Sequence, residues 1–185
     1  MHSQAMVHGD LKGVRLRSPV TALLPDTFLK ANILVDQSGC ARLADFGLLT
    51  IASDPANSTH ASSVVIGGTI RWMSPEHLDP DHFNLKDGRP TEQSDCYAVG
   101  MVIYEVLSGQ VPFASSKTHT VIRKVMEGER PGRPEGAEGV WFTDELWETL
   151  TSCWTTRRES RPSIEVVLEC VTRHPGLLPY PGTLA

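Results

Sequence analysis

The apolar residues of this chain fall into short runs near its start and into helical patterns further along. Residues 33–35 and 43–44 are brief apolar runs, and the turn-like sequence 36–39 lies between them. Short apolar runs bounded by turn residues are typical of buried strands joined by a tight turn. We therefore expect a β-hairpin in this part of the chain.

Four later segments have the residue spacing of helices. The most apolar of them, residues 96–107, is apolar nearly all round and is therefore expected in the middle of the domain, with Ser94 as its N-cap. The other helices, given with the residues expected to face the core, are 118–127 (Val121, Ile122, Val125), 143–154 (Leu146, Leu150, Cys153) and 164–171 (Val166, Val167, Cys170). The pattern predicts a mainly helical α+β domain.

Composition and charge narrow the class of protein. The chain has 185 residues, 40% hydrophobic and 21% charged, with a net charge of −5. Because like charges do not form runs, binding to nucleic acid or to an anionic membrane has no support. We interpret Trp141, Trp147 and Trp154 as core anchors, since no basic stripe accompanies them. The longest apolar run, residues 97–104, is too short to span a bilayer, so we expect a soluble cytoplasmic protein.

The four cysteines are Cys40, Cys96, Cys153 and Cys170, and none of them forms a CxxC pair. This spacing argues against a zinc site and against a disulfide framework. Three of them lie in apolar stretches, and we expect these to be buried, reduced thiols.

Three polar side chains near the predicted hairpin suggest chemistry. Asn32 and Asp45 flank the hairpin, and Asp10 lies earlier in the chain. If the hairpin forms, Asn32 and Asp45 lie at its ends and point into one cavity. Carboxamide and carboxylate oxygens suit Mg²⁺, which usually bridges such ligands to phosphate. Asp10 could then accept a proton from a hydroxyl group near that metal.

These residues belong to motifs that occur in a recognisable order. Residues 8–12 read HGDLK, residues 45–47 read DFG and residues 74–76 read SPE, with Asn32 between the first two motifs. Any one of these motifs alone is a weak signal, but the ordered set resembles the signature of eukaryotic protein kinases. The resemblance implies a protein-kinase-like C-lobe: a helical bundle around a central apolar helix, with a small β-hairpin at the active site.

The resemblance extends only to the larger, C-terminal lobe of the family fold. The 185 residues contain no Gly-rich loop of the form GxGxxG and no matching strand lysine of the N-lobe. We therefore expect residues 1–173 to form a partial kinase domain without an N-lobe, followed by a flexible tail at residues 174–185. For the same reason, we expect negligible activity from this polypeptide alone.

The resemblance implies a role for each motif residue in phosphoryl transfer from ATP, with Mg²⁺, to a hydroxyl group of a protein substrate. Asp10 would orient the acceptor and take its proton, and Lys12 would steady the γ-phosphate. Asn32 and Asp45 would hold Mg²⁺, so Lys12, Asn32 and Asp45 are the expected cofactor-binding residues. The sequence predicts neither the identity of the substrate nor the oligomeric state.

Other positions match residues that support the active site in the family. Asp95 is expected to accept hydrogen bonds from the backbone of the catalytic loop. Arg161 is expected to form a buried ion pair with Glu76, whose loss would cost several kcal/mol. His8 and Gly47 are expected to have structural roles.

The class of acceptor hydroxyl is indicated by two features. Thr69 resembles the residue that faces the substrate next to the acceptor, and its combination with Lys12 is that of kinases acting on serine or threonine. Residues 71–73 read RWM and resemble the tyrosine-kinase-like group. We therefore expect a tyrosine-kinase-like family member that acts on serine or threonine, with tyrosine as the less favoured acceptor.

Two features depart from the family pattern. The family has its Asn five residues after the catalytic Asp, whereas Asn32 follows Asp10 by 22 residues, and removing residues 14–30 restores the family spacing. We hypothesise that this segment is a retained intron or a gene-model error; the alternative is a genuine surface loop, which loop-closure entropy tolerates. Gly9 replaces an Arg that resembles a clamp for a phosphorylated activation loop, so we expect no regulation through that clamp.

Two competing interpretations stay open. The chain could be a non-catalytic, pseudokinase-like module that binds partner proteins, although the retained Asp10, Lys12, Asn32 and Asp45 argue against it. It could also be an incomplete gene model of a full kinase.

Overall fold

The computed structural model describes residues 6–12, 14–16, 32–35, 41–43, 50–51, 69–86, 88–136 and 141–173. Its strands are β1 (Met6–Val7), β2 (Val14–Leu16), β3 (Ile33–Val35), β4 (Ala41–Leu43) and β5 (Thr50–Ile51). Its α-helices are α1 (Pro75–Leu78), α2 (Glu92–Ser108), α3 (Thr118–Met126), α5 (Asp144–Cys153) and α6 (Ile164–Arg173). Within these described residues, the 3₁₀ helices are η5 (Ile70–Trp72) and η6 (Arg158–Ser160). The predicted mainly helical fold is confirmed.

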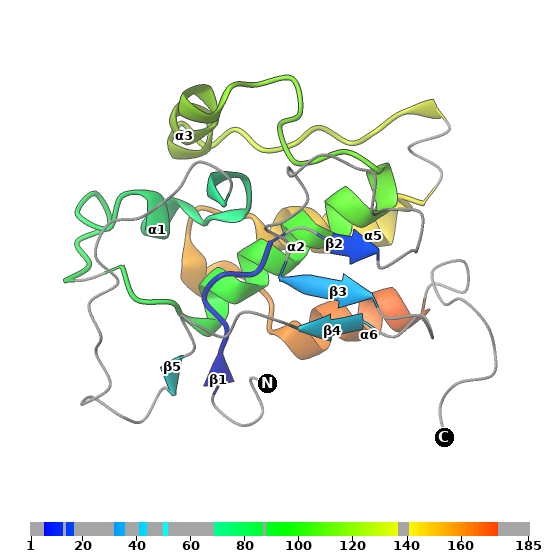
Figure 1. Ribbon diagram of the computed structural model, residues 1–185, viewed down its shortest axis with the longest axis horizontal. Coiled ribbons are helices and arrows are strands. Elements are labelled where there is room, and N and C mark those ends of the chain that lie inside the picture. Colours follow the sequence, from blue (N-terminus) through cyan, green and yellow to red (C-terminus); the bar gives the residue numbers. More distant parts are fainter. Residues whose placement is uncertain are drawn as a thin grey trace.

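Helix α2 crosses the middle of the molecule, as predicted for the apolar helix (Figure 1). The side chains of Tyr97 and Met101 on α2 have no exposed surface. The predicted N-cap is wrong, because α2 begins at Glu92 and is capped by Thr91. Thr91 Oγ1 accepts a hydrogen bond from the backbone N of Ser94 at 3.1 Å, and Ser94 Oγ accepts one from the backbone N of Thr91 at 2.8 Å. Ser94 is thus the third helical residue of a capping box.

Helices α5 and α6 build the main core against α2. Leu146, Leu150 and Cys153 of α5 are fully buried there, as predicted, and so is Trp154. A Cβ atom on Gly100 of α2 would lie 2.6 Å from the indole nitrogen of Trp154. The glycine therefore allows the indole ring to pack directly on the helix backbone.

Three residues predicted to lie in the core are exposed instead: Trp141 (43%), Ile122 (36%) and Val166 (50%). In a helix, a residue next to a buried one is turned about 100° away from it. This explains why Ile122 and Val166 reach solvent beside the buried Val121 and Val167. Trp141 precedes α5 and is not placed by the apolar face of that helix.

The predicted hairpin is present, since β3 and β4 pair antiparallel, with Ile33 opposite Leu43. Strand β2 was not expected, because it lies in the segment interpreted as an insertion. It pairs in parallel with β3, with Val14 opposite Ile33, and so makes a three-stranded sheet in the order β2-β3-β4. A separate antiparallel pair joins β1 to β5.

The described cysteines, Cys96, Cys153 and Cys170, are buried and form no disulfide, as predicted for three of the four. The hydrogen bond between Cys153 and Cys96, together with burial, raises the pKa of the Cys153 thiol, which keeps it protonated. Cys40 lies outside the described residues. Among the described helices, none has the length and apolar character needed to cross a membrane.

Candidate active site

The side chains of Asp10, Lys12 and Asn32 meet where β3 begins. Lys12 Nζ lies 2.6 Å from Asp10 Oδ2. Asn32 Nδ2 donates to the same carboxylate oxygen at 2.9 Å and to the backbone O of Asp10 at 2.6 Å. The side chains of Lys12 and Asp10 are 11% and 16% exposed, so the group is shielded but reaches solvent. Because both partners of Asn32 Nδ2 are pure acceptors, the amide orientation is fixed and Asn32 Oδ1 is the atom left to bind a cation.

Residues 14–30 do not separate Asp10 from Asn32 in space. The backbone N of Asn32 donates to the backbone O of Lys12 at 3.1 Å. The chain therefore returns beside Lys12 after the extra segment, and it does so next to the parallel pair of β2 and β3. The long separation in sequence between Asp10 and Asn32 is thus compatible with one compact site. The hypothesis that the segment is a retained intron stays a prediction.

Helix α2 supports the loop that carries Asp10. Asp95, which is 2% exposed, accepts hydrogen bonds from the backbone N of His8 at 2.7 Å and from the backbone N of Gly9 at 2.9 Å. His8 is fully buried, and its Nδ1 lies 3.3 Å from the backbone N of Asp10. Gly9 has a φ of +79°, a conformation that glycine adopts without strain. The expected contact of Asp95 with this loop is present.

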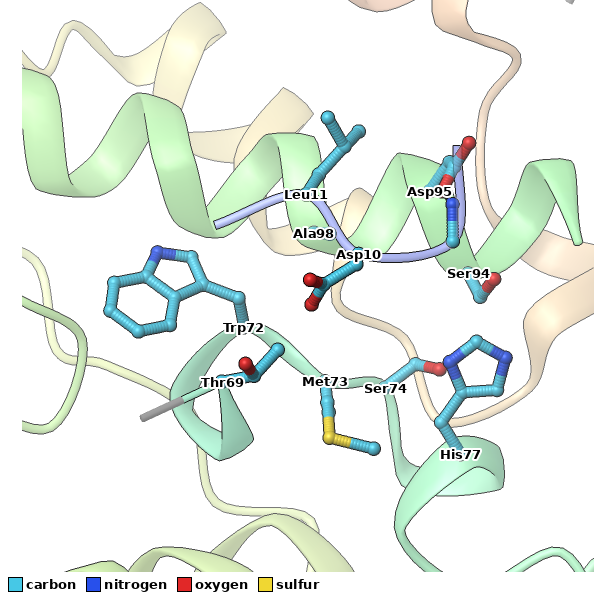
Figure 2. Close-up of a pocket in the computed structure, with 11 residues that line it drawn as sticks. Asp10, Leu11, Thr69, Trp72, Met73, Ser74, His77, Ser94, Asp95 and Ala98 are labelled. Atoms are coloured by element: carbon cyan, nitrogen blue, oxygen red, sulfur yellow. Dashed lines mark hydrogen bonds between the residues drawn. The ribbon is translucent and has the colours of Figure 1, made fainter. Parts of the chain in front are cut away.

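Thr69 contacts the cluster of Asp10, Lys12 and Asn32 through Lys12. Lys12 Nζ donates to Thr69 Oγ1 at 3.2 Å, so the ammonium group bridges Thr69 and Asp10. Figure 2 shows the carboxylate of Asp10 directed towards the side on which Thr69 and Trp72 lie. A pocket in this region is lined by Gly9, Asp10, Leu11, Thr69, Trp72, Met73, Ser74, His77, Ser94, Asp95 and Ala98.

Glu76 and Arg161 form a buried, two-pronged ion pair. Arg161 Nη1 and Nη2 lie 2.6 Å and 2.7 Å from the two oxygens of Glu76. Burial alone would raise the pKa of Glu76, but the hydrogen bonds and charge of Arg161 outweigh it and hold that pKa below its usual value. The Arg161 guanidinium also lies 5.1 Å from the ring centroid of Tyr97, a favourable cation–π contact. The pair expected from the sequence is present, and it ties the start of α1 to the segment before α6.

One charged residue near the site was not anticipated from the sequence. Glu105 Oε2 on α2 accepts a hydrogen bond from Trp72 Nε1 at 3.1 Å. Burial raises the pKa of Glu105 to about 7, although the hydrogen bond from Trp72 opposes this rise. No local pattern could have revealed the contact, because the two residues are 33 positions apart.

Asp45 and Gly47 lie outside the described residues, so their predicted roles stay predictions. Within the described part, no three His, Cys, Asp or Glu side chains cluster as metal ligands. The oxygen of the fixed Asn32 amide is nevertheless a donor that Mg²⁺ accepts, so Asn32 fits a magnesium ion as one of its ligands.

Similarity to known proteins extends over most of the chain. The family described as "Protein tyrosine and serine/threonine kinase" matches residues 28–171. The chain is 31% identical over 160 residues to the receptor-interacting serine/threonine-protein kinase 3 of Rattus norvegicus, covering 81% of the chain and 31% of that protein. It is 30% identical over 176 residues to the serine/threonine-protein kinase mos of Patiria pectinifera, covering 93% of the chain and 42% of that protein.

A plant protein is similar to the chain to about the same degree. The chain is 31% identical over 159 residues to the serine/threonine-protein kinase PCRK2 of Arabidopsis thaliana, covering 79% of the chain and 36% of that protein. The chain thus spans less than half the length of each of these three relatives. Since the family match takes in most of the chain, this protein belongs to the protein tyrosine and serine/threonine kinase family.

Proposed function

We propose that this chain carries the phosphoryl-transfer site of a protein kinase that uses ATP and Mg²⁺ and acts on serine or threonine hydroxyls of proteins. The observation that carries the proposal is the joint binding of Asp10 Oδ2 by Lys12 and Asn32. A carboxylate, an ammonium group and a carboxamide thus lie within one shielded group. Phosphoryl transfer depends mainly on such positioning and on charge stabilisation.

Each of these residues has a distinct role in the proposal. Asp10 orients the acceptor hydroxyl and takes its proton. Lys12 has three N–H donors; two go to Asp10 and Thr69, and the third suits a γ-phosphate oxygen. Asn32 Oδ1, together with Asp45, is the proposed ligand set for Mg²⁺. When bound, MgATP supplies the phosphoryl group and the metal charge that offsets the charge developing on its oxygens.

The contact between Lys12 and Thr69 supports serine or threonine as the acceptor. It is the pairing that the sequence resemblance associates with kinases of that class, and its distance of 3.2 Å is that of a hydrogen bond. The names of three relatives also describe serine/threonine-protein kinases.

The 185-residue polypeptide alone is expected to transfer phosphate at a negligible rate. The proposed site holds the acceptor-side base and a metal ligand, but the sequence has no Gly-rich loop to cover the phosphates. Clear transfer from labelled ATP to a generic protein substrate by the purified chain would contradict this expectation.

A nucleotide titration tests the proposed site directly. A fluorescent ATP analogue is added to the purified chain with and without Mg²⁺, and Mg²⁺ is expected to raise the affinity several-fold. Asn32→Ala is expected to weaken the effect of Mg²⁺, because it removes one of the two proposed ligand side chains. Asp81→Asn, at an exposed position in a turn, is the matched control and is expected to behave like the wild type.

Two results would overturn the proposal: binding that does not respond to Mg²⁺ in the wild type, or an Asn32→Ala variant that keeps the full response. Circular dichroism confirms that each variant is folded. A protein that binds partners without binding nucleotide would instead support a pseudokinase-like module.

A further inference from the structure

The short helix η5 lies at the edge of the pocket, and its three side chains contact three different parts of the fold. Ile70 is buried against α3. Trp72 donates from its indole nitrogen to Glu105 of α2. Arg71 reaches the turn at residues 112–116, which follows α2. Helix η5 is therefore fixed by its neighbours rather than by its own single turn of hydrogen bonds.

Of these three side chains, Arg71 forms the set of hydrogen bonds with the strictest geometry. Its Nη1 donates to the backbone O of Pro112 at 2.8 Å and of Phe113 at 2.6 Å, and its Nη2 donates to the backbone O of Ser116 at 2.7 Å. Only a planar guanidinium offers several donors in a fixed fork, so a lysine cannot reproduce this set. Phe113 has a φ of +56°, a strained conformation for a bulky residue that persists only when the surroundings hold it. Arg71 is one of the groups that hold it.

A short path leads from η5 to the proposed site. The backbone N of Trp72 donates to the backbone O of Thr69 at 3.0 Å, which closes η5 onto Thr69. The side chain of Thr69 accepts from Lys12 at 3.2 Å, and Lys12 lies 2.6 Å from Asp10. A displacement of η5 would therefore move the Thr69 side chain and change its hydrogen bond with the Lys12 ammonium group.

We infer that Arg71 is a positioning residue for the proposed phosphoryl transfer. By fixing η5 on the 112–116 turn, it keeps Thr69 within hydrogen-bond distance of Lys12, and so keeps the ammonium group on Asp10. Arg71 acts through Thr69 and not on the reacting groups themselves. The inferred role of Arg71 in phosphoryl transfer rests on the proposed function. The geometric part of the inference, that Arg71 keeps Thr69 within hydrogen-bond distance of Lys12, concerns the chain without nucleotide.

The geometric part is tested by NMR of the ammonium groups in ¹⁵N-lysine-labelled protein. A Lys12→Arg variant assigns the Lys12 signal by its disappearance, and Thr69→Val shows where that signal lies when the hydroxyl partner is missing. Arg71→Ala is expected to shift or broaden the Lys12 signal in the same way as Thr69→Val. Arg123→Ala, which removes an exposed arginine paired with Glu127 on α3, is the matched control and is expected to leave the signal unchanged.

Arg71→Lys is the second variant, in case Arg71→Ala does not fold. It keeps the charge but loses the fork, so it is expected to shift the Lys12 signal in the direction that Thr69→Val shifts it. A folded Arg71→Ala or Arg71→Lys protein with the wild-type Lys12 signal would overturn the inference. This readout needs no nucleotide, so a failed ATP titration would count against the proposed function and leave the positioning role of Arg71 to be decided by the Lys12 signal.

Discussion

At the scale of single residues, Glu105 links the acidity of the solution to stability. Burial raises the pKa of Glu105 to about 7, well above the value near 4.3 of an exposed glutamate. Between these two pH values, Glu105 is therefore protonated in the folded chain and ionised in the unfolded chain. Folding stability from this group is complete below the lower value and is lost as the pH rises through about 7.

The predicted consequence is a stability that falls between about pH 4.5 and pH 7. Since the side chain reaches solvent, screening reduces the effect to about 1 kcal/mol. Thermal melts at a series of pH values measure it as the difference between the wild type and Glu105→Gln, which cannot ionise. Glu148→Gln, at an exposed position on α5, should leave the wild-type profile intact. A Glu105→Gln profile parallel to the wild type at every pH would refute the assignment.

At the scale of elements, residues 14–30, which we interpret as an insertion, separate Lys12 from Asn32 in the sequence, yet Lys12 and Asn32 are in contact. The hydrogen bond between the backbone O of Lys12 and the backbone N of Asn32 connects the chain before the segment to the chain after it. If residues 14–30 were deleted, the chain would read Lys12-Gly13-Ala31-Asn32, and the same bond would become the closing bond of a four-residue β-turn. The site therefore does not need the segment for its local geometry.

We predict that a variant lacking residues 14–30 folds and keeps the contacts among Asp10, Lys12 and Asn32. Shortening the connection favours folding by about 2 kcal/mol, since each halving of loop length is worth about 0.6 kcal/mol, while loss of the pairing between β2 and β3 offsets part of this gain. The Lys12 ammonium signal should stay at its wild-type position, and thermal melts report the stability. Loss of that signal in a folded deletion variant would show that the segment is part of the site.

At the scale of the whole molecule, the elements with strong local patterns were predictable from the sequence. The hairpin of β3 and β4, the apolar helix α2 and the amphipathic helices α3 and α5 all follow from the spacing of apolar residues. The start of α2 was misplaced because Thr91 and Ser94 are both good capping residues, and only the reciprocal hydrogen bonds of the box decide between them.

The contacts that hold the site together were harder to predict from the sequence. Those of Asp95 and of Glu76 with Arg161 were expected only through the family resemblance, since they join positions about 85 residues apart. The fork of Arg71 and the burial of Glu105 had no sequence signal, because they depend on how η5 is placed against α2 and the turn that follows it. Because residues 14–30 are interpreted as foreign to the fold, the pairing of β2 with β3 is not predicted.

The central claim, that a metal–nucleotide complex binds beside Asp10, Lys12 and Asn32, is tested most directly with Mn²⁺ in place of Mg²⁺. The paramagnetic ion broadens NMR signals of nuclei near it. With Mn²⁺ and ATP present together, the Lys12 ammonium signal and the Asn32 side-chain amide signal are expected to broaden, and Asn32→Ala is expected to protect the Lys12 signal. Binding of the complex that leaves both signals sharp would contradict the claim.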